Sequence, residues 1–240
     1  ISIHPYNFCE KDSNAEGVIQ YLDNLHEKLK TWTTRKEVPI YVTELGWPTT
    51  KRSECGTTES DSAINLAQFY LSAAARPHIK GVWWYTLIDD EYAPRGRQQH
   101  FGLLRKDFSP KPSYHALRDV SEVIHTGTVR EVVQIGSGIK AVRFAHDEKR
   151  QTLALWSRGE TTGLILRLKP NTVLKQTVLT KEVGRRESAR VRMVNSGRSV
   201  FVQVKTMPLL MIGELDVLDI TPVRPEAFMN EQVDASESDR

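Results

Sequence analysis

The sequence lacks a long apolar run, a strong excess of one charge and an abundance of cysteine. A membrane helix needs about 18 or more consecutive apolar residues, whereas the densest apolar stretch, 207–213, has the length of a strand. The 33 basic and 30 acidic residues are spread along the chain and leave a net charge of +3. We therefore expect neither a membrane span nor a nucleic-acid partner. With 240 residues, 39% hydrophobic and 26% charged, the chain fits one large globular domain or two small ones.

Two cysteines, Cys9 and Cys55, are too few for a disulfide-rich scaffold, and their separation excludes a CxxC redox or zinc motif. They could form one disulfide if they lie on neighbouring loops, or they could be two unrelated small residues; the spacing allows both. The sequence also lacks a starting methionine and a signal-like segment, because residues 1–4 have the pattern of a strand interior. We expect the natural N-terminus to lie upstream or to have been cleaved away.

The first half of the chain alternates short apolar strands with amphipathic helices, which is typical of βαβ units and a parallel sheet. The expected elements are strands at 1–4, 39–43 and 81–85 and helices at about 18–33, 58–76 and 112–124. Thr58 is a candidate N-cap, since acidic residues follow it in the first turn.

The second half changes to short strands separated by turn residues, which favours an antiparallel β-sandwich. The expected strands are 129–135, 140–145, 152–157, 163–168, 173–179, 190–194, 199–204 and 209–213, with turns at 136–138 and 195–197. We place the boundary near Thr126, with an α/β part at 1–126 and a β-sandwich at 127–221. The remaining segment, 222–240, is rich in proline, acidic and small residues, so we expect a flexible tail.

In a parallel barrel the functional groups lie at the C-terminal ends of the strands, so those ends are the places to search. The first strand ends in His4-Pro5-Tyr6, and period-two alternation places His4 and Tyr6 on the same side. The second strand ends at Glu44. A carboxylate at the mouth of an apolar strand is costly unless it is paired or used, so we favour a functional role for Glu44 over a solvated surface acid.

The third strand ends in three aromatic residues, Trp83, Trp84 and Tyr85, and acidic residues follow at 89–91. Aromatic faces beside carboxylates suit sugars, because the CH-rich ring faces stack while the hydroxyls seek hydrogen bonds. Alternation turns one of the two tryptophans toward the helices. Tyr85 shares the parity of Trp83, which favours these two for the site.

Four motifs occur in order: His4-x-Tyr6, Thr43-Glu44-x-Gly46-Trp47, Gly81-x-x-Trp84-Tyr85 and the stretch 101–117. Together they resemble strands six, seven and eight and the final helix of the clan A glycoside hydrolases, with families 39 and 5 as the nearest types. A β-sandwich after the barrel is similar to the family 39 layout. The resemblance covers about half of the chain and implies an α/β fold, namely the C-terminal part of a TIM (β/α)8 barrel followed by a β-sandwich.

The resemblance implies a retaining glycoside hydrolase that acts on a poly- or oligosaccharide, with Glu44 as the catalytic nucleophile. In such enzymes the His and Tyr that end strand six line the sugar site and hydrogen-bond the nucleophile, and an aromatic residue after strand eight forms its floor. The candidate substrate-binding residues are His4, Tyr6, Trp47, Trp83, Trp84, Tyr85 and Asp89. No metal or cofactor is expected, and the resemblance implies a secreted or periplasmic location.

The main gap is the acid/base residue. Retention requires two carboxyl groups about 5 to 5.5 Å apart, and the family carries the second one at the end of strand four, upstream of this chain. Three strands cannot close a barrel, so we expect an N-terminal half-barrel, as a separate chain or a missing segment, to supply that Glu. One of Asp89, Asp90 and Glu91 could stand in, but a substrate-contacting or solvated loop is the simpler interpretation.

Two other functions fit the same residues. The chain could be a non-catalytic carbohydrate-binding or scaffold protein derived from this fold, or a transglycosylase in which a sugar hydroxyl replaces water. His100, before Phe101, could reach the cleft. The histidines outside the motifs are scattered without metal-ligand spacing, namely His26, His78, His115, His125 and His146. A GxSxG motif is absent, and the basic stretch 181–192 is interpreted as a solvated hairpin.

Overall fold

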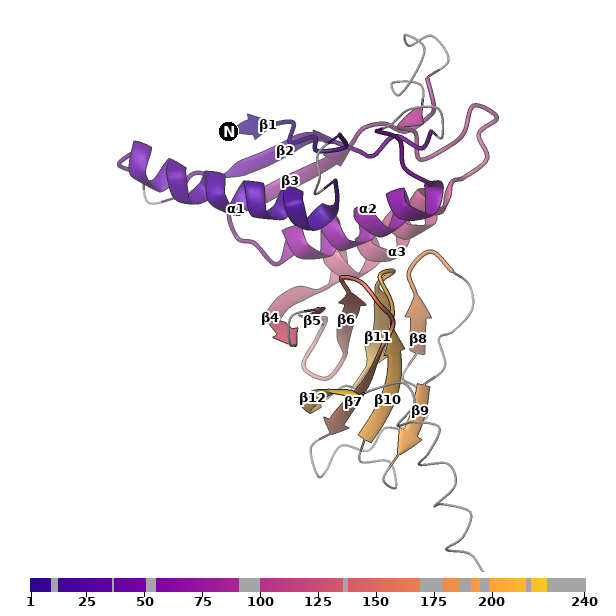
Figure 1. Cartoon of the computed structure of the whole chain (residues 1–240). Coiled ribbons are helices and arrows are strands. Elements are labelled where there is room, and N and C mark those ends of the chain that lie inside the picture. Colours follow the sequence, from indigo (N-terminus) through magenta and orange to yellow (C-terminus); the bar gives the residue numbers. More distant parts are fainter. Residues whose placement is uncertain are drawn as a thin grey trace, which may run out of the picture. The chain divides into compact units, whose positions relative to one another are not determined.

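The computed structural model describes residues 1–9, 13–35, 37–50, 55–90, 100–135, 138–168, 179–185, 191–194, 199–214 and 217–223. The chain divides into two compact units, Ile1–His125 and Thr126–Arg240, which are described separately (Figure 1). No helix in the described ranges is long and apolar enough to cross a membrane.

The first unit is built on a three-stranded parallel sheet in the order β1-β2-β3. Its elements are β1 (Ser2–Ile3), α1 (Ala15–Trp32), β2 (Ile40–Leu45), α2 (Glu59–Ala74), β3 (Ile79–Trp84) and α3 (Pro112–Thr126). The alternation of strand and helix expected from the sequence is confirmed, with shifts of a few residues at the ends. The first strand is shorter than expected, because His4 lies beyond its end.

Side-chain caps fix where the first two helices begin. The Asn14 side chain accepts a hydrogen bond from the Gly17 N–H at 2.9 Å, and Thr58 Oγ1 accepts one from the Asp61 N–H at 3.0 Å. Glu59 and Asp61 in the first turn of α2 complement the helix dipole. Thr58 is thus the N-cap that the sequence predicts.

The two faces of the sheet differ in composition. Ile40 and Val42 of β2 are fully buried in one cluster with Val18 and Leu22 of α1 and Phe69 of α2. Figure 1 shows α1 and α2 against one side of the sheet. The opposite face is open and carries large aromatic side chains: Tyr41 is 40% exposed and Trp83 53% exposed.

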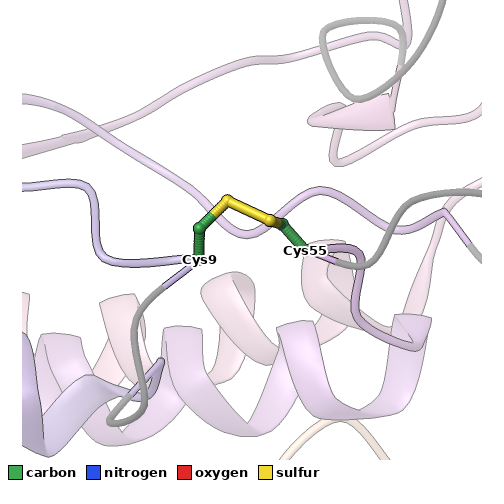
Figure 2. Close-up of a disulfide and its surroundings, with 2 residues drawn as sticks. All are labelled: Cys9 and Cys55. Atoms are coloured by element: carbon green, nitrogen blue, oxygen red, sulfur yellow. A yellow bond between two sulfur atoms is a disulfide. The ribbon is translucent and has the colours of Figure 1, made fainter.

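A disulfide joins Cys9 and Cys55, with 4.7 Å between their Cα atoms (Figure 2). Cys9 lies in the segment that follows β1, and Cys55 lies between β2 and α2. Of the two interpretations that the spacing allows, the structure therefore has the paired one. The bond ties together the two segments that leave the C-terminal ends of neighbouring parallel strands.

The second unit consists of two antiparallel sheets, in the orders β4-β5-β6-β11-β8 and β12-β7-β10-β9. The strands are β4 (Thr128–Ile135), β5 (Ile139–Ala145), β6 (Gln151–Ser157), β7 (Thr162–Leu168), β8 (Leu179–Glu182), β9 (Val191–Val194), β10 (Ser199–Val204), β11 (Leu209–Gly213) and β12 (Val217–Val223). One apolar core draws on both sheets, with Leu153 and Leu155 from the first and Leu164, Val200 and Val202 from the second.

Two strands of this unit differ from the expectation. The strand expected at 173–179 falls mostly outside the described residues, and β8 begins only at Leu179. Strand β12 is not expected from the sequence, and it extends to Val223, so the first two residues of the segment expected as a tail pair with β7. The rest of that segment, 224–240, and the greater part of the expected turns at 136–138 and 195–197 lie outside the described residues.

Candidate active site

Glu44 reaches the open side of the sheet because the side-chain alternation of β2 breaks just before it. Val42 and Leu45 both lie in the core that faces the helices, although residues three apart in a regular strand point to opposite sides. The pairing register of β2 with β3 shifts between these two residues. Such an irregularity re-aims side chains, and here both Thr43 and Glu44 contact residues from β1 and the turn that follows it.

The Glu44 carboxylate has two neighbours on the same oxygen. The Tyr6 hydroxyl donates a hydrogen bond to Oε2 at 3.2 Å, and His4 Nδ1 lies 3.5 Å from Oε2. Both residues come from a tight turn centred on Pro5, in which the Tyr6 N–H donates to the His4 carbonyl at 3.0 Å. The structure thus brings together the three residues that the sequence motifs single out at the ends of the first two strands.

The electrostatics of the pair favour Tyr6 as a permanent donor. Burial raises the pKa of the Tyr6 hydroxyl well above its usual value of 10.0, and the neighbouring Glu44 carboxylate and Tyr85 raise it further. The phenol therefore keeps its proton at any physiological pH. It can offer that proton only as a hydrogen bond, and Glu44 is the acceptor.

An aromatic cluster stands beside the carboxylate. The Tyr85 ring centroid lies 6.5 Å from that of Tyr6 and 5.5 Å from that of Phe101, and Phe8 joins the group at 5.5 Å from Tyr6 and 5.6 Å from Phe101. Tyr85 is 36% exposed, whereas Phe101 is buried. The Tyr85–Thr86 peptide bond is cis. Because its side chain is exposed, Tyr85 is the cluster member that can present a ring face to a ligand.

Gly46 permits this close arrangement. A Cβ atom at position 46 would meet the Tyr85 carbonyl oxygen, and it would lie 2.9 Å from the Phe101 ring. Any side chain here would force the segment after β3 away from β2. Steric crowding thus explains why the Thr43-Glu44-x-Gly46-Trp47 motif has a glycine at position 46. Phe101 is part of the same contact, although it is not among the site residues predicted from the sequence.

The tryptophans divide between the two sides of the sheet. Trp47 is 1% exposed and its ring centroid lies 5.9 Å from that of Trp84, whose Nε1–H donates to the Phe101 carbonyl at 3.1 Å. Trp47 is thus in the helix-facing core, and Trp84 packs against it. Trp83 lies on the open face, 6.5 Å from Tyr41. The structure does not gather these three residues around Glu44.

Asp89 is held in a buried ion pair. Its Oδ1 accepts from Lys111 Nζ at 2.7 Å and from the Gly102 N–H at 2.8 Å, and the two charged side chains are 8% and 1% exposed. Lys111 Nζ also donates to Thr49 Oγ1 at 2.8 Å. Asp89 therefore anchors the segments that follow β2 and β3 to the start of α3. Asp90 is exposed, and Glu91 lies outside the described residues.

The described residues contain no group of three or more histidine, cysteine, aspartate or glutamate side chains that could hold a metal ion. His100 contributes its backbone carbonyl, which accepts from the Thr49 N–H at 2.9 Å. Within these ranges the chemically distinctive cluster is a carboxylate, a phenol, an imidazole and an exposed aromatic ring at the C-terminal ends of parallel strands. That placement is typical of enzymes with parallel α/β sheets.

No protein-family model matches the sequence, and no curated protein matches it either. Solved structures do match, and among them are clan A glycoside hydrolases. A family 39 glycoside hydrolase from the gut symbiont Bacteroides cellulosilyticus WH2 is similar with a TM-score of 0.65 and 24% identity, over 88% of this chain. The chain spans 44% of the length of that enzyme.

Two further structures match with lower TM-scores. The first is GH5_18 from Streptomyces cattleya in complex with GlcNAc, which has a TM-score of 0.42 and 20% identity over 52% of this chain and 30% of that one. The second is the endo-β1,6-glucanase BT3312, which has a TM-score of 0.46 and 14% identity over 89% of this chain and 40% of that one. At these identities the likeness concerns the fold. The resemblance to clan A glycoside hydrolases that the sequence motifs indicate is confirmed at that level.

Proposed function

We propose that this chain is the C-terminal part of a retaining glycoside hydrolase that cleaves O-glycosidic bonds of a poly- or oligosaccharide, with Glu44 as the nucleophile. One observation carries the proposal: Glu44 lies at the C-terminal end of parallel strand β2, one residue before its last, and both Tyr6 and His4 approach its Oε2. A carboxylate held on one oxygen is oriented, which a nucleophile requires.

Each neighbour of Glu44 has a part in a double displacement. In the first step Glu44 attacks the anomeric carbon and forms a glycosyl ester, while the glycosidic C–O bond breaks and the leaving oxygen takes a proton from the second carboxyl group. In the second step that group accepts a proton from water, which cleaves the ester and frees Glu44. Within the described residues, Oε2 has the two polar contacts, so Oε1 is the oxygen available for attack. Tyr6 stabilises the charged carboxylate before attack and after release, and the exposed Tyr85 ring offers a stacking surface for the sugar.

The second carboxyl group belongs to a region that completes the barrel. Parallel strands β1 and β3 are the two edges of the sheet, and the open face carries the exposed aromatic residues Tyr41 and Trp83. We propose that an N-terminal half-barrel pairs with these edges, covers that face and places an acid/base Glu about 5 to 5.5 Å from Glu44. The second unit then serves as an accessory β-sandwich. The disulfide favours a secreted or periplasmic location.

Covalent trapping tests the nucleophile directly. The chain, co-produced with its N-terminal half-barrel, is incubated with a panel of activated 2-deoxy-2-fluoro glycosides, and the peptides are then analysed by mass spectrometry. We expect one fluoroglycosyl group on the peptide that contains Glu44. Glu44→Gln should abolish both labelling and hydrolysis, whereas Glu131→Gln, on exposed strand β4 of the second unit, should change neither.

Labelling on another residue of an active assembly would refute the role of Glu44. An assembly that binds sugars but neither hydrolyses nor becomes labelled would refute the hydrolase and support a carbohydrate-binding protein. Hydrolysis without any trapped ester, together with inversion at the anomeric carbon by NMR, would refute the retaining mechanism.

A further inference from the structure

A line of polar side chains runs from the edge strand of the sheet to Glu44. Ser2 Oγ lies 2.6 Å from Thr43 Oγ1, and Thr43 Oγ1 lies 3.0 Å from His4 Nε2. The other ring nitrogen of His4, Nδ1, lies 3.5 Å from Glu44 Oε2. In the parallel β1–β2 pair the backbone partner of Ser2 is Tyr41, and Thr43 lies two residues farther along β2, so the two hydroxyls meet diagonally across the pair.

The donors and acceptors in this line are mutually dependent. A hydroxyl has one proton to donate, and a neutral imidazole has one N–H and one bare nitrogen. At this distance from the carboxylate, the lone pair of a bare Nδ1 would be repelled, whereas an Nδ1–H would be attracted. If Nδ1 carries the proton, Nε2 is the acceptor and Thr43 must donate to it. Thr43 then accepts from Ser2, so each hydroxyl in the line has a defined role.

We propose that Thr43 and Ser2 are positioning residues that set the tautomer of His4, so that its neutral ring carries the proton on Nδ1, the nitrogen beside Glu44. The catalytic value of this arrangement rests on the proposed function: the His4 N–H is a second polar donor group beside the nucleophile, in addition to the Tyr6 hydroxyl. The tautomer itself does not depend on any substrate. The break in alternation at β2 is what allows Thr43 and Glu44 to contact the two ends of one imidazole ring.

Nitrogen NMR tests the proposal, because the ring ¹⁵N signals report which nitrogen carries the proton. The full chain, labelled with ¹⁵N in the histidine rings, is examined by long-range ¹H–¹⁵N correlation at a pH well above about 6.5, where free imidazoles are neutral. Free histidine prefers the Nε2–H form, so the expected Nδ1–H pattern for His4 is a reversal of the default. A His4→Gln variant assigns the signal.

Variants separate positioning from general structure. Thr43→Val removes the hydroxyl and should shift the His4 signals toward the Nε2–H pattern, whereas Thr43→Ser should retain the wild-type pattern. Ser2→Ala should move the signals in the same direction as Thr43→Val, by a smaller amount. Thr128→Val, on an exposed position of β4, is the matched control and should leave the His4 signals unchanged.

An Nε2–H pattern for His4 in the unsubstituted chain would overturn the proposal, and so would an Nδ1–H pattern that persists in Thr43→Val. These results need no turnover, so they are separable from the fate of the proposed function. A chain with the Nδ1–H pattern but with no trapping at Glu44 would refute the hydrolase while supporting the positioning role. Trapping at Glu44 together with an Nε2–H pattern for His4 would support the hydrolase and refute the positioning role.

Discussion

Removing the Cys9–Cys55 disulfide should destabilise the first unit by several kcal/mol. The two cysteines are 46 residues apart in sequence, and the closed loop contains α1 and β2. In the chain-entropy description, a cross-link over a loop of 46 residues restricts the unfolded chain by about 4 kcal/mol. We therefore expect a double Cys9→Ser/Cys55→Ser variant to lose about 4 kcal/mol of unfolding free energy.

Tryptophan fluorescence in urea can follow this unit selectively. Of the five tryptophans in the chain, Trp156 lies in the second unit, and the other four lie in the first. A Trp156→Phe background thus makes the fluorescence report on the unit that contains the disulfide. Trp47 is fully buried there, so its emission changes on unfolding.

The disulfide should be removed in two ways, by chemical reduction and by substitution of both cysteines. The unsubstituted chain treated with a reducing agent should unfold at the same urea concentration as the double-serine variant, since both lack the cross-link. Because the loss acts through the unfolded chain, refolding should slow more than unfolding accelerates. A shift of less than about 1 kcal/mol by both routes would refute the chain-entropy reasoning for this loop.

Three further predictions concern side chains around the site and in the core. Tyr6→Phe removes a hydrogen bond to a charged group, about 1.5 to 3 kcal/mol, so kcat/KM of the assembled hydrolase should fall by roughly tenfold to a hundredfold. Unchanged kcat/KM would exclude a role for this bond. Lys111→Met leaves Asp89 buried without its cation and should lower the free energy of unfolding in urea by about 3 to 5 kcal/mol. The double variant Lys111→Met/Asp89→Leu should lose less, and equal losses in the two variants would contradict the pairing. Burial, helped by the stacked His26 ring, lowers the pKa of His78 below its usual 6.5, so the unfolded chain binds the proton more readily and stability should fall as the pH drops below about 6.5. His78→Gln should flatten that part of the stability profile, and an unchanged profile would count against the shift.

The sequence predicts the α/β half well because its signals are local. Apolar periodicity marks each strand and helix, and Thr58 is recognisable as an N-cap from the acidic residues that follow it. The clustering of Glu44 with His4 and Tyr6 also follows from the sequence, since the C-terminal ends of parallel strands meet at one edge.

The features that the sequence leaves open or does not reveal depend on partners that are distant in sequence. Nothing local shows that Asp89 is paired with Lys111, because the pair forms only when α3 returns to the sheet. Pro222 argues against a strand, but β12 is an edge strand, where a residue without an N–H is tolerated. Pairing of Cys9 with Cys55 likewise requires two loops to meet, which the spacing does not determine.

The orientation of Glu44 is the feature that strict pattern reasoning would place incorrectly. Period-two alternation from Ile40 and Val42, both buried against the helices, would direct Glu44 into the same core. The register shift before Leu45 prevents this, and it turns Thr43 and Glu44 to the same side. A regular strand would bury an unpaired carboxylate at a cost of several kcal/mol, so the irregularity both avoids that cost and exposes the carboxylate to Tyr6 and His4. Functional sites are where departures from the ideal strand are expected, so the irregularity beside Glu44 is an argument that rests on backbone geometry and does not depend on the motif.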